Sequence, residues 1–326
     1  MCAAMLRAIL IGNYGDGNFG DDVLRQYMTE TFACSWTVVT ARPEQQSDVP
    51  RIPCGLASLR TPWARTIRAL WRADLVVFGG GTLFTDAESL FACFLWGLHA
   101  FVAFILRKPI LFAFQGVGPF RTIIGERIAR FFFRRATFIS VRDTNSYELV
   151  SSWKCSVAIV QTADPAILLF DRYRVTIPED QRKYLTIIPR TQSGRELFDT
   201  ARTFLNRSPH LATALCPLQP EKEDPICNAY MYLFDDPILS FQRTPSDLIA
   251  FLCESSIILT QRYHGAIAAL SVGIRPHIVP LVSGDKLDVL RREIAADANI
   301  ATHFREQAMA GTKALEQFFL QCSCTK

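Results

Sequence analysis

The sequence lacks the cysteine patterns that mark zinc sites and disulfide-rich domains. It has ten scattered cysteines and no CxxC pair, and the two closest, Cys322 and Cys324, lie near the C-terminal end. Isolated cysteines in apolar runs are usually buried free thiols. We therefore expect reduced cysteines in a cytoplasmic protein, with neither a metal site nor a metal cofactor. The first residues lack the charged, apolar and cleavage regions of a signal peptide, so none is expected.

Internal repeats, low-complexity tracts and a strong charge of one sign are absent as well. The net charge is +4, and charged residues make up 20% of the 326 residues. So weak a charge argues against a nucleic-acid partner. Hydrophobic residues make up 49%, which indicates a globular protein with a large core and room for two domains. Residues 1–163 carry 17 Lys and Arg against 12 Asp and Glu, which suits an anionic substrate or a membrane surface.

One hydrophobic run, residues 89–106, is barely long enough to span a bilayer. His99 lies in its middle and an α/β pattern continues on both sides, so a buried helix is favoured over a membrane span. His99 itself is by default a hydrogen-bonded core histidine, and a catalytic role is the alternative.

Apolar strand-like runs alternate with helix-like stretches along the whole chain, which predicts parallel sheets with helices on both faces. Residues 163–183, which contain prolines and charges, are interpreted as a linker. We expect an α/β, GT-B-like fold with two Rossmann-like, doubly wound domains facing a cleft, at residues 1–170 and 171–326. The predicted strands are 7–12, 37–40, 74–79, 109–114, 137–141 and 157–162, then 184–190, 213–218, 238–241, 256–260 and 275–281.

Glycine-rich turns follow the strands of the first predicted domain. The loop GNYGDGNFGDD ends in Asp21 and Asp22, which either complement the start of the next helix or serve the chemistry. Gly80 and Gly81 either permit a turn with positive φ or bring backbone N–H groups to a ligand. Gln115 begins a similar turn after the next strand.

Basic residues stand at the ends of predicted strands or shortly after them, at the sheet edge where α/β proteins bind ligands. Arg142 does so in the first domain, where pairing with a neighbouring acid is the alternative to anion binding. Arg190 has the same placement in the second domain. Arg262 and His264, in the stretch LTQRYHGAIAALSVGIRP, lie between a strand and a helix, and helix N-termini favour anions.

Four stretches together resemble the polysaccharide pyruvyl transferase family: GNYGDGNFGDD, DLVVFGGGTLFTD, FISVRDTNSYELV and LTQRYHGAIAALSVGIRP. FQGVGPF and TADPAILL fit the same pattern. The family has a GT-B-like fold and transfers the pyruvyl group of phosphoenolpyruvate (PEP) onto two hydroxyls of a sugar as a cyclic ketal. The resemblance implies that Arg142, Arg262 and His264 bind PEP. It gives no firm role to Asp21, His99 or Arg190.

The resemblance also implies a role for each domain. Residues 1–170 would hold the sugar acceptor, which can be a lipid-linked oligosaccharide, and residues 171–326 would hold PEP, in surface or exopolysaccharide synthesis. PEP is then a donor substrate, and no cofactor is expected. A histidine that titrates near neutral pH can donate a proton, so His264 is the first candidate acid, with Asp21 and His99 as the alternatives.

Two other functions remain open, because a fold does not fix a chemistry. The chain can be a GT-B glycosyltransferase that uses a nucleotide sugar, although no acidic residue for the ribose can be assigned. It can also be a binding protein without activity. The basic, aromatic stretches 60–72 and 121–135 are either solvated helix faces or a peripheral contact with the inner face of an anionic membrane.

Overall fold

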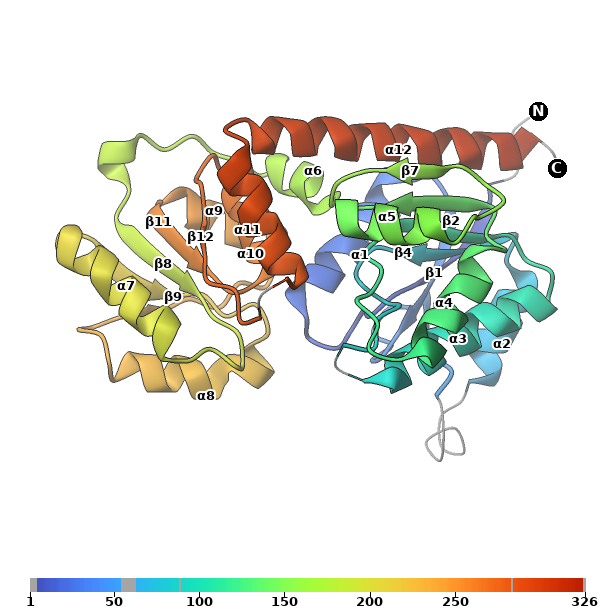
Figure 1. Ribbon diagram of the computed structural model, residues 1–326, viewed down its shortest axis with the longest axis horizontal. Helices are drawn as coiled ribbons and strands as arrows, with labels where there is room; N and C mark the ends of the chain where they lie inside the picture. The colour runs from blue at the N-terminus through green and yellow to red at the C-terminus, as the bar shows by residue number, and fades with distance from the viewer. Residues whose placement is uncertain (1–4, 54–62, 88, 283, 325–326) are drawn as a thin grey trace. The chain divides into compact units, whose positions relative to one another are not determined.

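The computed structural model describes residues 5–53, 63–87, 89–282 and 284–324 (Figure 1). The chain forms two compact units. Unit 1 is Met1–Pro165 with Glu306–Lys326, and unit 2 is Ala166–Arg305. The sequence predicts domains 1–170 and 171–326, so the main difference lies at the C-terminal end, where the last residues belong to the first unit.

Unit 1 is built on one parallel sheet with the order β3-β2-β1-β4-β5-β6-β7. The sequence predicts all of these strands except β3, whose short sequence DVP contains no apolar run. The central strand β4 and its neighbour β5 are buried along their whole length, as expected for a sheet covered on both faces. The strands are β1 (Arg7–Ile11), β2 (Ser35–Thr40), β3 (Asp48–Pro50), β4 (Leu75–Gly79), β5 (Ile110–Gln115), β6 (Phe138–Val141) and β7 (Ile159–Gln161).

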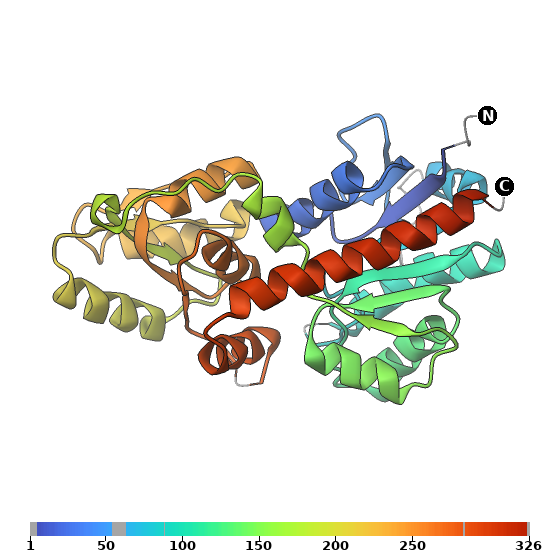
Figure 2. The same cartoon turned by 90° about the horizontal axis from the view of Figure 1, so that it is seen from above.

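Helices cover both faces of this sheet (Figure 2). On one face α1 (Phe19–Thr31) packs beside the C-terminal part of α12 (Ile300–Cys324). The Tyr27 and Thr312 hydroxyl oxygens lie 2.5 Å apart, and the rings of Phe32 and Phe319 meet edge-on with centroids 5.4 Å apart. These contacts explain why the chain end belongs to unit 1. The core on the other face is shared by α2 (Ala64–Arg72), α3 (Leu90–Ile105), α4 (Ile123–Phe133) and α5 (Thr144–Ser152).

Unit 2 has a second parallel sheet with the order β10-β9-β8-β11-β12. Its strands are β8 (Tyr184–Ile188), β9 (Ala212–Leu215), β10 (Ile238–Leu239), β11 (Ser255–Thr260) and β12 (His277–Ile278). Its helices are α6 (Ala166–Asp171), α7 (Arg195–Arg207), α8 (Pro220–Met231), α9 (Pro245–Cys253), α10 (Tyr263–Ser271) and α11 (Lys286–Ala296). The two doubly wound parallel sheets that the sequence predicts are therefore present.

Two local expectations are wrong. The predicted linker contains α6, because Ala166, Ile167, Leu169 and Phe170 form a short apolar helix that is buried in unit 2. The run at 89–106 does form a helix, α3, but it is not buried all round: His99 and its neighbours face the core, whereas several phenylalanines face outward. Within the described ranges, no helix combines the length and apolarity needed to cross a bilayer.

Each sheet has a point where the strand order reverses, and ligands of open α/β sheets bind beyond the carboxyl ends of strands at such points. In unit 1 the reversal lies between β1 and β4, and in unit 2 between β8 and β11. The glycine loop and Gly80 follow the first pair of strands. Arg190 and Arg262 follow the second pair.

Candidate functional site

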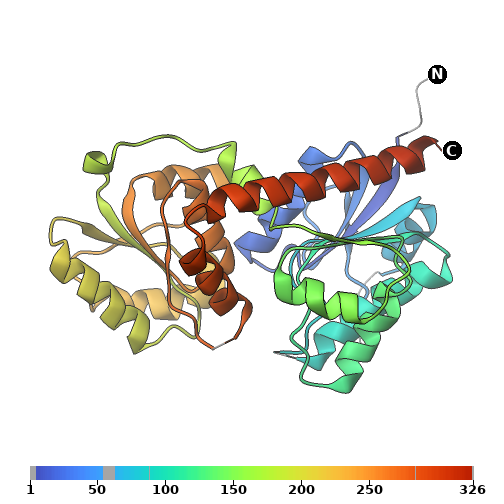
Figure 3. The same cartoon turned by 45° about the horizontal axis from the view of Figure 1, so that its top comes forward.

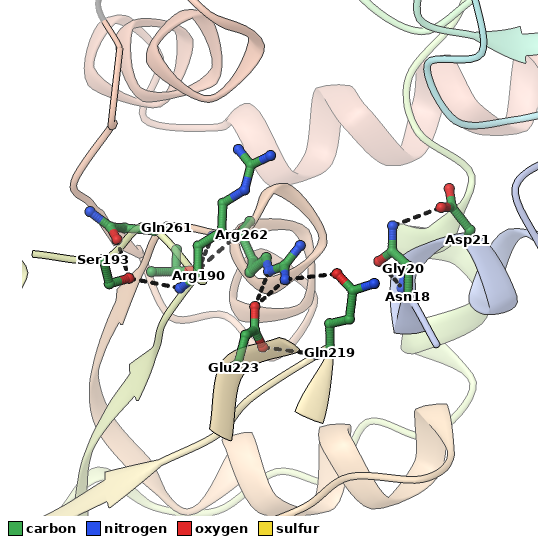
Figure 4. Close-up of polar contacts among 10 residues, drawn as sticks. Asn18, Gly20, Asp21, Arg190, Ser193, Gln219, Glu223, Gln261 and Arg262 are labelled. Carbon is green, nitrogen blue, oxygen red and sulfur yellow. Dashed lines mark hydrogen bonds and ion pairs between the residues drawn. The ribbon is translucent and has the colours of Figure 1, made fainter. Parts of the chain in front are cut away.

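Arg262 joins β11 to α10 and is tied to a buried acid (Figure 4). Its Nε and Nη2 donate to Oε1 of Glu223, and Nη2 also donates to Oε1 of Gln219 at 3.2 Å. Oε2 of Glu223 accepts the backbone N–H of Gln219 at 2.8 Å. The Glu223 side chain is fully buried, whereas 15% of the Arg262 side chain is exposed. The guanidinium is therefore held in one orientation, and the side chain keeps a part of its surface exposed.

The sequence around Arg262 explains why α10 begins there. Thr260 Oγ1, at the end of β11, accepts the backbone N–H of Arg262 at 3.0 Å. A Cβ at Gly265 would lie 2.7 Å from Thr260 Oγ1 and 3.0 Å from Ile188 Cδ1, so only glycine lets α10 pack this closely. The N-cap residue of α10, Arg262, makes no capping hydrogen bond with its side chain. This helix terminus with an arginine beside it is suited to an anion, and half-buried His264 lies in its first turn.

Arg190 follows β8, the neighbour of β11 in the sheet. Its backbone N–H donates to Ser193 Oγ at 2.7 Å, and the Ser193 hydroxyl donates to Oε1 of Gln261. The turn after β8 is thereby fixed to the residue that precedes Arg262. The Arg190 side chain points away from the Glu223 carboxylate in Figure 4, and its contact with an anion stays a prediction.

In unit 1 the glycine loop holds a buried carboxylate, Asp21, in the first turn of α1. Its Oδ2 accepts from Nδ2 of Asn13 at 3.0 Å and from Nδ2 of Asn18 at 2.7 Å. Asn18 also caps α1, and Arg51 Nη2 donates to Oδ1 of Asn13 at 3.0 Å. Two amides therefore orient Asp21. Its other oxygen faces Gly81, where a Cβ would lie only 3.1 Å away.

The double-glycine turn after β4 has a structural basis. Gly80 and Gly81 both have φ near +76°, a conformation that other residues rarely adopt, and a Cβ on Gly80 would lie 2.8 Å from Leu24. Gln115 is fully buried, and its Nε2 donates to the carbonyl oxygens of Phe78 and Gly80, at 3.0 Å each. Gln115 thus holds the turn in place, and its predicted contact with a ligand stays a prediction.

Arg142 has the predicted position at the end of β6, but it is sealed in the protein. Its Nη1 donates to Oδ2 of Asp164, and its Nη2 donates to Thr82 Oγ1 at 3.0 Å. Only 2% of the Arg142 side chain and none of the Asp164 side chain is exposed. Asp143 caps α5 by accepting the Ser146 N–H at 2.7 Å. The Asp164 pair gives Arg142 a structural role, and its direct contact with PEP stays a prediction.

His99 is a buried histidine on α3 that contacts the segment after β3. Its Nδ1 lies 2.8 Å from the Leu95 carbonyl oxygen, and its Nε2 accepts the Ile52 N–H at 2.9 Å. Burial lowers the pKa of His99 from 6.5 to about 4, and the nearby charge of Arg51 adds to this effect. The imidazole is therefore neutral at physiological pH and anchors the segment after β3.

The structure thus gathers the predicted residues at two sheet edges. Arg262, His264 and Arg190 share the edge of unit 2, and Asp21, Gly80, Gly81, Gln115 and Arg142 share that of unit 1. His99 is buried on α3 and binds the segment after β3. Sequence reasoning missed the polar partners Glu223, Gln219, Asp164, Asn13, Asn18 and Arg51. Asn13 and Asn18 lie in the glycine loop, so the sequence could have indicated them as partners of Asp21. Glu223 is 39 residues from Arg262, and no local pattern points to it. Asp164 lies in TADPAILL, but it is 22 residues from Arg142, so the stretch does not indicate their pairing.

The match to a known protein family covers residues from both sheet edges. The family model for polysaccharide pyruvyl transferase matches residues 18–280, a range that contains Asp21, Arg142 and Arg262. No curated protein sequence matches the chain significantly.

Solved structures are similar in fold. The MnaA–UDP complex of S. aureus is 17% identical with a TM-score of 0.54, covering 93% of this chain and 91% of that one. UDP-GlcNAc 2-epimerase of Neisseria meningitidis, bound to UDP-GlcNAc, is 12% identical with a TM-score of 0.57, covering 96% and 99%. These are GT-B-type proteins, so the predicted GT-B-like α/β class is confirmed. At this identity the likeness extends to the fold alone.

The Glu223 pair predicts a stability difference between two substitutions. Glu223→Ala leaves the Arg262 charge and the Gln219 N–H without their carboxylate, so it should lower the free energy of unfolding by about 3–5 kcal/mol. Glu223→Gln keeps the volume and a hydrogen-bond acceptor, so its loss should be clearly smaller. Urea denaturation measures both, with exposed Asp224→Ala on the same helix as the control. Equal, small effects of all three substitutions would contradict a structural role for the pair.

The buried state of His99 predicts a pH-dependent stability. The unfolded chain takes up a proton at His99 below about pH 6.5, whereas the folded protein does so only near pH 4. The stabilisation from this group is therefore present above pH 6.5 and is lost as the pH falls towards 4, by on the order of 3 kcal/mol. His99→Asn should flatten the pH dependence of urea unfolding in this range, and His210→Asn, on the surface, should not. An unchanged slope in His99→Asn would show that His99 is accessible to protons in the folded state.

Proposed function

The chain belongs to the polysaccharide pyruvyl transferase family, and we propose that it transfers the pyruvyl group of PEP onto a sugar as a cyclic ketal. The observation that carries this proposal is the Arg262 guanidinium, oriented by Glu223 and partly open, beside the amino end of α10. Family membership supports pyruvyl transfer in general. The donor, the ketal product and the roles of single residues are the proposal.

The reaction joins two hydroxyl oxygens of one sugar to C2 of PEP. A proton adds to the methylene carbon C3, which becomes a methyl group, and the first hydroxyl oxygen bonds to C2. The second hydroxyl oxygen then bonds to C2 as the bond from C2 to the phosphate oxygen breaks. Inorganic phosphate leaves. The two hydroxyls lose their protons in the reaction. One of these protons replaces the proton that the protein's acid gave to C3, and the other leaves with phosphate.

The edge of unit 2 suits the donor. PEP presents a carboxylate and a phosphate on one small rigid frame, and an arginine held in a fixed orientation discriminates such a geometry better than a mobile cation does. The backbone N–H groups at a helix amino end add a fixed partial positive charge. His264 is in the first turn of the same helix, and we assign it the proton that C3 receives. A positioned general acid contributes about 10²–10⁴ to such a step.

The edge of unit 1 suits the acceptor. Asp21 is buried and held by two amides, with one oxygen facing Gly81. A fixed carboxylate surrounded by amides is typical of a site that binds sugar hydroxyls, since it accepts their protons in hydrogen bonds. Asp21 is therefore proposed to bind the acceptor diol and to draw a proton from it. Unit 1 then has the acceptor role and unit 2 the donor role.

A nucleotide-sugar glycosyltransferase is the second candidate, because the similar structures named above contain UDP or UDP-GlcNAc. A carboxylate for the ribose would be expected at the edge of unit 2. Glu223 is the acid next to Arg262 there, but it is fully buried, and its two oxygens are bonded to Arg262 and to the Gln219 N–H. It is thus poorly placed to bind a ribose, which favours PEP over a nucleotide sugar.

Binding of the donor can be tested directly by thermal shift. PEP should raise the melting temperature of the wild-type protein, because a ligand that binds the folded state stabilises it. Arg262→Ala removes a charge-assisted contact of about 1.5–3 kcal/mol, so PEP affinity should fall about 10- to 100-fold. Arg262→Lys should also weaken binding, since an ammonium cannot reproduce the fork. Arg207→Ala, an exposed arginine of the same unit, is the control.

The same assay separates the candidate functions. A melting temperature that responds to UDP-GlcNAc and not to PEP would assign a nucleotide sugar and overturn the proposal. An unchanged PEP response in Arg262→Ala would place PEP elsewhere. Release of inorganic phosphate from PEP in the presence of a polyol acceptor would extend the result from binding to turnover.

A further inference from the structure

Helix α3 exposes an apolar face that the fold does not use. Phe91, Phe94, Phe101 and Phe104 have 42–52% of their surface exposed, and Ile105 has 61%. Residues 89–106 contain no Asp, Glu, Lys or Arg, and their histidine is buried against the segment after β3. Single exposed apolar residues are normal, but a row of them along one helix marks a site that is covered by something else.

Helix α4 extends this face. It lies beside α3 (Figures 1 and 3), and Gly97 permits the close approach, since a Cβ there would lie 2.8 Å from Ile128. The exposed rings of Phe104 and Phe131 meet with centroids 6.0 Å apart. Ile123 and Ile124 are 69% and 52% exposed on α4. The two helices therefore share one continuous apolar surface, here named the α3/α4 face.

Positive charge surrounds the α3/α4 face. Arg127, Arg134 and Arg135 are exposed on or just after α4, and the Arg135 guanidinium lies 3.6 Å from the ring centroid of Phe131. The acid of α4, Glu126, accepts a hydrogen bond from Trp153 Nε1 at 3.2 Å. A cavity of about 490 Å³ opens next to the end of α3, with Arg72, Arg107 and Lys108 in its wall; its one acid, Asp74, is paired with Arg7.

We propose that the α3/α4 face docks on the surface of an anionic lipid bilayer, with its phenylalanines and isoleucines among the acyl chains and its arginines at the lipid phosphates. Aromatic and aliphatic side chains framed by arginine are the composition of interfacial helices. The other side of α3 packs on the unit 1 core, so the helix lies in the interface and does not cross the membrane. The predicted basic stretch 60–72 lies partly outside the described residues, and the exposed Trp71 and Arg72 at its end extend the same surface.

Charge distinguishes this occupant from a second copy of the chain. If two copies met through the same face, the arginines of each would oppose those of the other, and like charges across an interface are destabilising. An anionic membrane supplies the opposite charge, and each arginine near such a surface adds attraction, which salt screens. This inference rests on unit 1 alone and does not depend on the choice of PEP as donor.

Flotation of the full-length protein with vesicles tests the proposal. Vesicles of phosphatidylcholine with phosphatidylglycerol should carry the wild-type protein at low salt and release it at high salt, and vesicles of phosphatidylcholine alone should carry much less. Phe101→Ser with Phe104→Ser should weaken binding about tenfold or more by removing inserted apolar surface. Arg134→Glu with Arg135→Glu should weaken binding at least as much by reversing two charges.

Matched controls come from unit 2. Tyr232→Ser with Leu233→Ser removes exposed apolar residues, and Arg202→Glu with Arg207→Glu reverses exposed charges; both should float like the wild type. All substituted residues are exposed, and circular dichroism confirms that each variant is folded. Three results would overturn the proposal: equal flotation with both vesicle types, wild-type flotation of the two α3/α4-face variants, or a soluble dimer that Phe101→Ser with Phe104→Ser converts into a monomer while the wild type does not float.

Discussion

A single buried carboxylate, Glu223, orients Arg262 at the carboxyl edge of the sheet in unit 2. A charge removed from water is stable only when strong partners replace the water, and Glu223 has two, the Arg262 guanidinium and the Gln219 N–H. Arg262 in turn stands at the start of a helix, where the helix dipole disfavours a cation. The ion pair therefore stabilises both the buried charge of Glu223 and the positive charge of Arg262 at the helix amino end. It also fixes which way the guanidinium points.

Unit 1 contains a related pair with a different outcome. Arg142 and Asp164 also join an arginine at a strand end to a buried acid, but that arginine is 2% exposed where Arg262 is 15% exposed. The difference separates a pair that is enclosed in its unit from one whose arginine keeps an exposed surface, which we propose meets the donor. In unit 1 the group that we propose for the acceptor is Asp21, whose Oδ2 is held by two amides and whose Oδ1 faces Gly81.

Much of the fold could be predicted from the sequence, because buried parallel strands appear as short apolar runs and their turns as glycine clusters. The exceptions have physical reasons. Helix α6 resembled a linker because its apolar residues lie between prolines, and α12 leaves unit 2 because Phe319 packs on Phe32, a contact between residues far apart in sequence. For the site, the positions of Arg142, Arg262 and His264 followed from the strand ends. The exposure of the two arginines could not be predicted. It depends on Asp164 and Glu223, which come close to Arg142 and Arg262 only in the folded chain.

The central claim is that the edge formed by β11, α10 and Glu223 takes PEP. Hydrogen–deuterium exchange of the full-length protein, measured with and without PEP, tests it most directly. PEP should slow exchange in peptides that cover residues 255–271 and 219–223, because bound anions engage the backbone N–H groups at the start of α10 and restrain the Arg262 pair. Unchanged exchange in these peptides at saturating PEP, or slowing there by UDP-GlcNAc alone, would contradict the account.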